Sequence, residues 1–309
     1  MKKKEKNKKA VVFGGSGFLG SYVSDALTAA DFQVTIFDKK RSPYLQDQQN
    51  MIKGDILDFA QVLDTVIGAD VVYNFAGIAD IKEANQQPLE SVKYNVLGNT
   101  NILEACVMKE VSRFVYASTV YVYSEHGGFY RSTKQASELI IENYQKLFGL
   151  NFTILRFGSL YGRRANEFNW INSIIRQALT EGKMQRKGNG EEIRDYLHVK
   201  DAAQASVDIL MDKYENNYIM VTGNQTIKVK DLLIMIGEML DNVVTIEYLD
   251  EPMEGHYKIT PYTFRPRLAN KYSPNMQLDL GQGILDLIYD MYKQLKDSNN
   301  DKPIVSLPD

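Results

Sequence analysis

Hydrophobic and polar positions follow two alternating patterns over the first half of the chain. Short apolar runs bounded by turn residues are typical of buried strands, whereas apolar residues that recur every three or four positions are typical of amphipathic helices. The apolar runs predict strands at 11–13, 32–38, 51–53, 70–77, 113–123 and 151–157, and the longer pattern predicts helices at 18–30, at 91–109, at 132–148 and in a segment that runs through Ile67. Strands separated by helices in this order predict an α/β fold with a Rossmann-type, doubly wound parallel sheet.

The pattern becomes less regular after about residue 160. It predicts helices at 170–181, 201–211, 229–240 and 283–296, a strand at 243–249 and a turn-rich loop at 186–195. We therefore expect three parts: a flexible basic tail (1–9), a nucleotide-binding domain (10–160) and a smaller mixed α/β C-terminal domain for the substrate (161–309). Part of residues 194–226 should pack back on the first domain.

The first strand ends in a turn made almost entirely of glycine. Gly14, Gly17 and Gly20 follow at intervals of three residues and open the first helix. Such a turn lets backbone N–H groups at a helix N-terminus approach a pyrophosphate, which a Cβ would obstruct. Asp38 ends the second strand 18 residues after Gly20, which is close to the spacing of an acid that binds a ribose; the alternative is a solvated turn residue. A carboxylate there would repel a 2′-phosphate and favours NAD over NADP, although three basic residues (39–41) follow at once.

Composition and charge add few constraints. The 309 residues are 44% hydrophobic and 24% charged, and the net charge of −3 gives no overall bias toward nucleic acid or membranes. Six lysines fall within the first nine residues, where a solvated tail is favoured over a basic arm. No apolar stretch is long enough for a secretory signal or a membrane span, and Cys106 is the only cysteine. We therefore expect a cytoplasmic protein without disulfides, and no metal, because the three histidines lack metal-ligand spacing.

The motif Tyr-x-x-x-Lys occurs four times, and its context separates the copies. Only Tyr130 follows a strand with hydroxyls near its end, Ser118 and Thr119, and opens a long helix in the first half of the chain. Tyr130 and Lys134 are four residues apart on that helix and therefore share one face. The other copies start at Tyr196, Tyr289 and Tyr292.

Transfer of a hydride from a carbinol carbon needs a base that takes the hydroxyl proton. A phenol with a pKa near 10 is about 3 units too weak at neutral pH, a deficit of roughly 4 kcal/mol. A lysine ammonium about 4 Å away contributes about 4 kcal/mol at an effective dielectric near 20. Tyr130 and Lys134 together therefore have about the required strength, and Thr119 could hold and polarise the same hydroxyl. For each residue alone, a structural role is the alternative.

Several motifs in order resemble the extended short-chain dehydrogenase/reductase family, specifically its NAD-dependent epimerase/dehydratase group. They are the glycine turn, Asp38, Asp55, the NFAG run at 74–77, Ser118–Thr119, Tyr130-x-x-x-Lys134, LRFGSLYG at 155–162 and RDYLHVKDAA at 194–203. The likeness covers roughly residues 10–300. It implies NAD as the cofactor and a nucleotide-linked sugar as the substrate.

The resemblance implies a role for each matching residue. The cofactor site would comprise Gly14, Ser16, Gly17, Phe18, Leu19 and Gly20 at the pyrophosphate, Asp38 at the adenosine ribose, Asp55 and Ile56 at the adenine, and Ala76, Gly77, Asn95 and Lys134 along the rest of the cofactor. Thr119, Tyr130 and Lys134 would be catalytic, and Ser118, Thr119, Ser159, Arg194 and Arg267 would contact the substrate. Arg194 matches the arginine that typically binds the diphosphate of the substrate in this group.

The chain departs from the pattern of the group in four places. Ser159 stands where an asparagine is usual, and the loop from Thr119 to Tyr130 is short and lacks the usual prolines. Val120–Tyr121 stands where sugar 4,6-dehydratases carry an Asp-Glu pair, which argues against a dehydratase. Near the C-terminus, either Arg265 or Arg267 could meet a phosphate.

The resemblance favours oxidation of a ring hydroxyl, C4 in the leading interpretation, by a nucleotide-sugar 4-epimerase that returns the hydride to the other face of the keto sugar. The alternative is a nucleotide-sugar 4-dehydrogenase that releases the keto sugar. A remote alternative is an NAD-binding regulator without turnover, which the presence of both Tyr130 and Lys134 argues against. By analogy we expect a homodimer that forms a four-helix interface through the helix carrying Tyr130 and its neighbour, and no nucleic acid or membrane partner.

Overall fold

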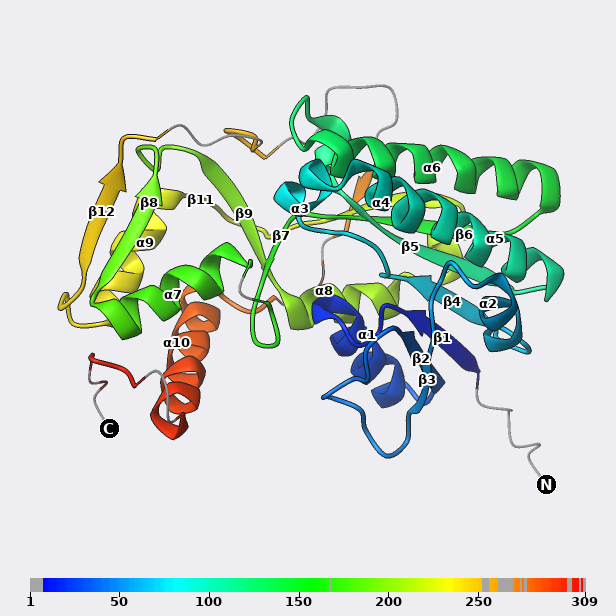
Figure 1. The fold of residues 1–309 in the computed structure, drawn as a ribbon, viewed down its shortest axis with the longest axis horizontal. Helices are drawn as coiled ribbons and strands as arrows, with labels where there is room; N and C mark the ends of the chain where they lie inside the picture. The colour runs from blue at the N-terminus through cyan, green and yellow to red at the C-terminus, as the bar shows by residue number, and fades with distance from the viewer. Residues whose placement is uncertain are drawn as a thin grey trace. The chain divides into compact units, whose positions relative to one another are not determined.

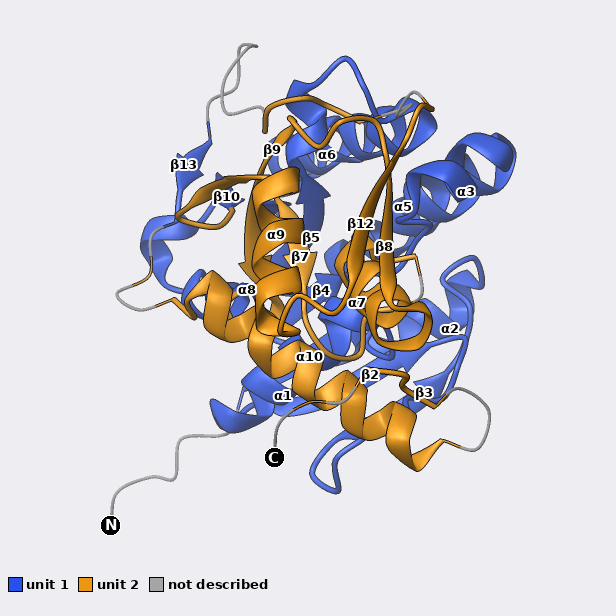
Figure 2. Cartoon of the chain, turned by 90° about the vertical axis from the view of Figure 1, so that its left-hand side faces the viewer, with its two compact units in different colours: residues 1–157, 202–221, 262–272 blue, residues 158–201, 222–261, 273–309 orange. Residues whose placement is uncertain are grey.

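The computed structural model describes residues 8–166, 168–251, 256–260, 269–272, 274, 277–298, 302–305 and 307. The chain divides into two compact units (Figure 2). Unit 1 comprises residues 1–157, 202–221 and 262–272, and unit 2 comprises residues 158–201, 222–261 and 273–309. The chain therefore passes between the units more than once, and the division of labour between a cofactor domain and a substrate domain stays a prediction.

An eight-stranded sheet, in which every pair of neighbouring strands is parallel, forms the centre of unit 1 (Figure 1). In spatial order its strands are β13 (Asn270–Lys271), β10 (Asn217–Val221), β6 (Phe152–Phe157), β5 (Arg113–Thr119), β4 (Val71–Asn74), β1 (Lys9–Phe13), β2 (Gln33–Asp38) and β3 (Asn50–Lys53). The chain order runs outward from the β1–β4 pair in both directions. This is the doubly wound, Rossmann-type arrangement, and the predicted fold class is confirmed.

Helices cover both faces of this sheet (Figure 1). On one face lie α2 (Phe59–Thr65), α5 (Asn99–Met108) and α6 (Gly128–Phe148), and on the other lie α1 (Phe18–Ala29) and the unit 1 part of α8 (Val199–Asp208). Successive side chains of β4 illustrate this, because Val72 packs in the core with Ile102 and Ile141, whereas the Tyr73 hydroxyl donates to the backbone oxygen of Ser206 at 2.8 Å. Both faces of each central strand are therefore buried.

The segment predicted as one helix at 91–109 consists of three elements. These are α4 (Pro88–Val92), a π-helical stretch, η1 (Lys93–Gly98), and α5. A π-helical insertion changes the direction of the side chains that follow it, and such insertions are frequent at functional sites. A short helix before it, α3 (Ile81–Gln86), has no counterpart among the sequence predictions.

The strand predicted at 113–123 ends at Thr119, and the prediction is wrong for the last four residues. They form a short 3₁₀ helix, η2 (Val120–Tyr123), because the Thr119 hydroxyl accepts a hydrogen bond from the backbone N–H of Tyr121 at 3.2 Å and caps the turn. Helix α6 begins at Gly128, earlier than predicted, and ends at Phe148. Gly149 follows with φ of 74°, which confirms the predicted stop.

Unit 2 has two small sheets and its own core. The first sheet has the order β11 (Thr226–Lys228), β9 (Ile193–His198), β7 (Ser159–Tyr161), and the second pairs β8 (Lys183–Lys187) with β12 (Thr245–Leu249) in parallel. Helices α7 (Trp170–Glu181), α9 (Val229–Met239) and α10 (Leu280–Asp297) contribute most of the core. The loop predicted at 186–195 is shorter than expected, because β8 and β9 extend into it.

A short 3₁₀ helix, η3 (Asp212–Tyr214), completes the elements of unit 1. Within the described parts of the chain, no helix combines the length and the apolar character needed to cross a membrane.

Candidate functional site

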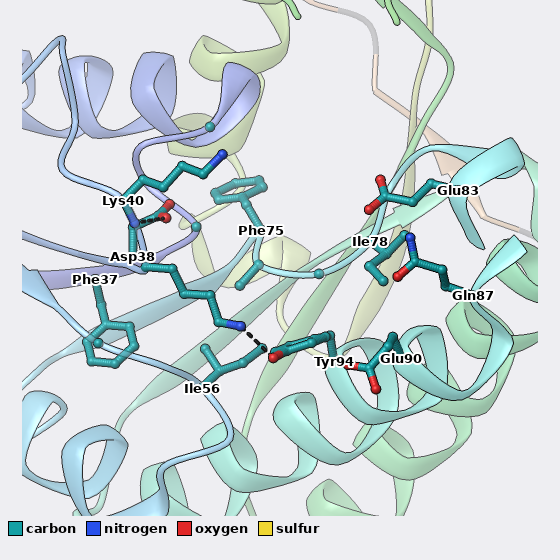
Figure 3. Close-up of a pocket in the computed structure, with 16 residues that line it drawn as sticks. Phe37, Asp38, Lys40, Ile56, Phe75, Ile78, Glu83, Gln87, Glu90 and Tyr94 are labelled. Carbon is teal, nitrogen blue, oxygen red and sulfur yellow. Dashed lines mark hydrogen bonds between the residues drawn. The ribbon is translucent and has the colours of Figure 1, made fainter.

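A pocket of about 450 Å³ opens in unit 1 at the carboxyl ends of β1, β2 and β4 (Figure 3). β1 and β4 are neighbours whose onward connections leave in opposite directions, which is the place where doubly wound sheets bind ligands. The volume lies in the range of cofactor and small-molecule sites. The lining residues include Gly14, Gly17, Phe37, Asp38, Lys39, Lys40, Ile56, Phe75, Ala76, Gly77, Ile78 and Tyr94.

The glycine turn lines one wall of this pocket with backbone atoms rather than side chains. A Cβ on Gly14 would lie 2.5 Å from the backbone nitrogen of Ala76, and a Cβ on Gly20 would lie 2.2 Å from the carbonyl oxygen of Gly14. Gly17 is the N-cap of α1 and supplies no side-chain cap, so the positive end of the helix dipole at Phe18 and Leu19 faces the turn. Backbone that is bare at a helix N-terminus fits a pyrophosphate, and the residues present therefore fit a dinucleotide.

Asp38 is fixed to this turn through its carboxylate. Its Oδ2 accepts a hydrogen bond from the backbone N–H of Ser16 at 3.1 Å, and its Oδ1 accepts one from the backbone N–H of Lys40 at 3.0 Å. The Ser16 hydroxyl in turn donates to the backbone oxygen of Lys40 at 2.8 Å. Each carboxylate oxygen keeps a further acceptor site for a ligand hydroxyl. The arrangement suits a ribose.

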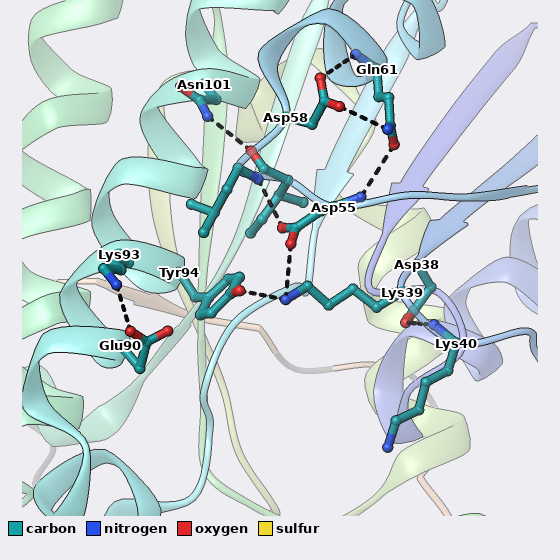
Figure 4. A network of polar contacts seen from close by, with 12 residues as sticks. Asp38, Lys39, Lys40, Asp55, Asp58, Gln61, Glu90, Lys93, Tyr94 and Asn101 are labelled. Carbon is teal, nitrogen blue, oxygen red and sulfur yellow. Dashed lines mark hydrogen bonds and ion pairs between the residues drawn. The ribbon is translucent and has the colours of Figure 1, made fainter.

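A lysine that sequence reasoning did not assign crosses one end of the pocket (Figure 4). The Lys39 ammonium lies 3.0 Å from Asp55 Oδ2, donates to the Tyr94 hydroxyl and lies 3.8 Å from the centroid of the Tyr94 ring. Asp55 also accepts from the backbone N–H of Leu57 at 3.0 Å. Ile56 lines the same end of the pocket.

Asn95 holds the loop after β4 in place. Its Oδ1 accepts from the backbone N–H of Ile78 at 2.7 Å, and its Nδ2 donates to the backbone oxygen of Ile78 and to the Thr133 hydroxyl, each at 3.0 Å. A Cβ on Gly77 would lie 2.4 Å from Asn95 Oδ1. Asn95 is buried, and its contacts within the protein position Gly77 and Ile78 at the pocket.

Thr119, Tyr130 and Lys134 lie where β5 ends and α6 begins. The Lys134 ammonium donates to the backbone oxygen of Ala117 at 2.7 Å and lies 6.0 Å from the centroid of the Tyr130 ring. The Tyr121 ring packs edge-on against Tyr130, with centroids 6.2 Å apart. Burial lowers the pKa of Lys134 to about 8, against the raising effect of the Glu138 carboxylate.

Ser118 forms a hydrogen bond to one member of a buried ion pair. Its hydroxyl donates to Glu138 Oε1 at 2.5 Å, and the Arg156 guanidinium binds both oxygens of the same carboxylate, at 3.0 and 2.7 Å. Ser118 and Thr119 point to opposite faces of β5, as successive strand residues must. The contact with Glu138 gives Ser118 a structural role, and its predicted contact with the substrate stays a prediction.

Two predicted substrate residues of unit 2 meet at a tyrosine that the sequence did not single out. The Ser159 and Tyr257 hydroxyls are 3.5 Å apart, and the Arg194 guanidinium carbon lies 4.3 Å from the centroid of the Tyr257 ring. Arg194 also donates to the backbone oxygens of Ile193 and Lys258, at 3.0 and 3.4 Å. Arg265 and Arg267 lie outside the described residues.

The residues missed from the sequence are Lys39, Tyr94, Glu138 and Tyr257. Lys39 and Tyr94 stand next to two predicted cofactor residues, Asp38 and Asn95, and that adjacency was the available signal. Burial lowers the pKa of His198 to about 4, and its ring packs edge-on against Tyr161 with centroids 5.2 Å apart. A neutral, packed imidazole has a structural role.

The chain matches the family model described as the NAD-dependent epimerase/dehydratase family over residues 10–221. A UDP-N-acetyl-α-D-glucosaminuronate decarboxylase from Bacillus cytotoxicus is 29% identical over 71% of this chain and 75% of its own length. A putative UDP-glucose 4-epimerase from Methanocaldococcus jannaschii is 27% identical over 89% of this chain and 95% of its own length.

The structure is similar to that of the UDP-glucose 4-epimerase of Thermotoga maritima, solved with UDP-glucose, with a TM-score of 0.83, 21% identity and coverage of 93% of this chain and 99% of the other. By their names, these similar proteins are a decarboxylase and UDP-glucose 4-epimerases. The family model spans more than two thirds of the chain and includes every residue that lines the pocket. The chain belongs to the NAD-dependent epimerase/dehydratase family, whose cofactor is NAD.

Proposed function

We propose that this chain is a nucleotide-sugar 4-epimerase that uses NAD. The observation that supports the proposal is that the Lys134 ammonium, bonded to the backbone oxygen of Ala117 near the end of β5, lies 6.0 Å from the centroid of the Tyr130 ring, in the unit that also holds the glycine-walled pocket. NAD, when bound, would supply the hydride acceptor and donor for the sugar carbon. Everything else in the reaction is a matter of proton transfer and positioning by the protein.

Proton transfer would fall to Tyr130. Its phenolate takes the proton of the C4 hydroxyl, and the same phenol later returns a proton to the oxygen. The Lys134 ammonium, fixed by Ala117, supplies the positive charge that favours the phenolate. Thr119 would hold the reacting hydroxyl. Lys134 would also reach the nicotinamide ribose.

The cofactor would lie along the pocket of unit 1. Gly14, Ser16, Gly17, Phe18, Leu19 and Gly20 would contact its pyrophosphate, Asp38 its adenosine ribose, Asp55 and Ile56 its adenine, and Ala76 and Gly77, held by Asn95, its remaining length. The cradle without Cβ atoms and the oriented Asp38 carboxylate support this direction of binding.

The nucleotide-sugar diphosphate would bind to Arg194. Tyr257 supports that arginine through ring stacking, and Ser159 would contact the sugar or the nucleotide. The relatives act on nucleotide-linked sugars, which supports this class of substrate. Their reactions differ, and an alternative within the proposal is a 4-dehydrogenase that releases the keto sugar.

Two features favour the epimerase over a 4,6-dehydratase. Val120 is buried and Tyr121 packs against Tyr130, at the positions where dehydratases carry an acid pair. Elimination of water needs a proton donor and a base there; Val120 can be neither, and Tyr121 alone does not replace a pair of carboxylic acids. A regulator without turnover is disfavoured because the base and its cation are both present.

Replacement of the proposed base tests this function. Tyr130→Phe should lower turnover of a nucleotide-sugar by roughly 10²- to 10⁴-fold while NAD affinity stays within about twofold, because only the proton acceptor is lost. Tyr289→Phe, on α10, is the matched control. Tyr289 also precedes a lysine by four residues, and the ammonium of that lysine, Lys293, lies 4.4 Å from the centroid of the Tyr289 ring. Unchanged turnover by Tyr130→Phe would exclude Tyr130 as the base. A wild-type protein that turns over no nucleotide-sugar would favour the regulator.

A further inference from the structure

The basic residues that follow Asp38 raise a question of cofactor choice. NAD and NADP differ by a phosphate on the adenosine ribose, which an Asp or Glu at the end of the second strand repels and a nearby cation attracts. Here Asp38 is followed directly by Lys39, Lys40 and Arg41. The structure shows where the first of these cations, the Lys39 ammonium, lies. This position could not be predicted from the neighbouring residues in the sequence.

The Lys39 side chain extends away from the Asp38 carboxylate and ends between Asp55 and Tyr94 (Figure 4). Its ammonium has three contacts there: the Asp55 carboxylate at 3.0 Å, the Tyr94 hydroxyl at 2.5 Å and the Tyr94 ring at 3.8 Å from its centroid. Burial alone would lower the pKa of Lys39, but the hydrogen bonds to Tyr94 and Asp55 raise it above its ordinary value. The ammonium is therefore charged, and Asp55 neutralises it.

The Asp38 carboxylate, in contrast, faces the glycine turn. Its two oxygens accept from the backbone N–H groups of Ser16 and Lys40. Backbone donors orient the carboxylate without adding a full positive charge beside it. The ribose end of the pocket thus keeps the Asp38 carboxylate. Of the two lysines that follow it, Lys40 lines the pocket, whereas the Lys39 ammonium is held by Asp55 and Tyr94.

We propose that Asp55 and Tyr94 set the preference for NAD over NADP by holding the Lys39 ammonium away from the adenosine ribose. The proposal rests on the proposed function, because it assumes that the pocket binds a dinucleotide with its adenosine ribose at Asp38. Lys39 has a long flexible stem, so its ammonium can turn to a phosphate near Asp38 once its two anchors are removed. Its side chain and that of Asp55 are 49% and 38% exposed, so the contacts are weak enough to be removed without unfolding the protein.

The test is a double-mutant cycle read as the ratio of NADP affinity to NAD affinity, measured by calorimetry on the full chain. Asp55→Asn should raise this ratio about 5-fold, the effect of one solvent-exposed charged hydrogen bond. Loss of an adenine contact would weaken the binding of both dinucleotides equally and would therefore leave the ratio unchanged. Tyr94→Phe, which keeps the ring, should raise it less. The gain should shrink as salt is added.

The Lys39→Met background identifies the cation responsible. In Lys39→Met/Asp55→Asn the gain should disappear, and Lys146→Met, which removes a lysine paired with Glu142 at 4.0 Å on α6, should leave the wild-type ratio unchanged. An unchanged ratio in Asp55→Asn, or a gain that persists without Lys39, would overturn the selectivity proposal while NAD binding continued to support the cofactor site. A wild-type protein that binds neither dinucleotide would instead overturn the proposed function.

Discussion

Lys134 holds a positive charge in an unfavourable place. Its side chain is buried, its ammonium is fixed to the backbone oxygen of Ala117, and burial lowers its pKa from 10.5 to about 8. A buried ammonium costs folding free energy, which the nearby Glu138 carboxylate offsets only in part. The proposed catalytic cation is therefore retained at the expense of stability, as is common at functional sites.

Lys134→Met should therefore inactivate the enzyme and stabilise it near pH 7. Below pH 8 the lysine is protonated in both states and the folded wild type bears the full cost, up to about 3 kcal/mol for a shift from 10.5 to about 8. Between these two values the unfolded state binds more protons, so wild-type stability rises with pH and the advantage of the variant shrinks. Urea unfolding of both proteins near pH 7 and near pH 10 measures this. A variant that is equally destabilised at both pH values would contradict the burial argument.

Residues differ in how well their contacts in the site could be predicted from the sequence. Tyr130 and Lys134 could be predicted as a pair, because a helix puts positions four apart on one face. Lys39 and Tyr94 are 55 residues apart and meet only because the end of β2 and the π-helical stretch converge at the pocket. The local pattern around either residue contains no information about such a contact.

At the scale of elements, the join between β1 and α1 depends on close backbone contact. Gly20→Ala would bring a Cβ within 2.2 Å of the carbonyl oxygen of Gly14, so the turn must shift, and we expect a destabilisation of about 1–3 kcal/mol together with weaker NAD binding. Gly237→Ala is the matched control on α9, where the nearest atom would be 4.0 Å away and alanine should stabilise the helix by about 0.5–1 kcal/mol. Thermal unfolding and NAD titration of both variants provide the measurement. Equal behaviour of the two variants would show that the turn tolerates a side chain.

Boundaries of elements followed from the sequence only where a local signal marks them. Gly149, in the left-handed conformation, ends α6 as predicted. The π-helical stretch at 93–98 and the 3₁₀ turn after Thr119 were missed, because apolar spacing continues through both. These two departures from regular geometry lie beside the pocket and beside Tyr130.

At the scale of the molecule, the parallel sheet followed from the alternation of strands and helices. We expected part of residues 194–226 to pack back on the first domain, but the pairing of β10 with β6 and of β13 with β10 could not be predicted, because these strands pair with partners that lie far away in sequence. The exchange of segments between the two units reflects tertiary packing rather than local pattern.

Homodimer formation through α5 and α6, proposed by family analogy, can be tested directly. Large apolar side chains are exposed on both helices: Met108 on α5, and Leu139 and Leu147 on α6. Light scattering should give about twice the chain mass of 35.2 kDa, and Leu139→Asp/Leu147→Asp should give the mass of one chain. Ile234→Asp on α9, where the side chain is 49% exposed, is the control and should leave the dimer intact. A wild-type monomer would refute the proposal.

The central claim is that the chain epimerises a nucleotide-sugar at C4 with no net change in the redox state of NAD. The most direct measurement incubates the purified protein with NAD and a set of UDP- and dTDP-linked hexoses and uronic acids. It follows absorbance at 340 nm and identifies the recovered nucleotide-sugars by NMR. We predict that one substrate gives its C4 epimer while reduced cofactor stays at or below the enzyme concentration. Reduced cofactor that accumulates in step with a released keto sugar, without an epimer, would contradict the account and identify the dehydrogenase.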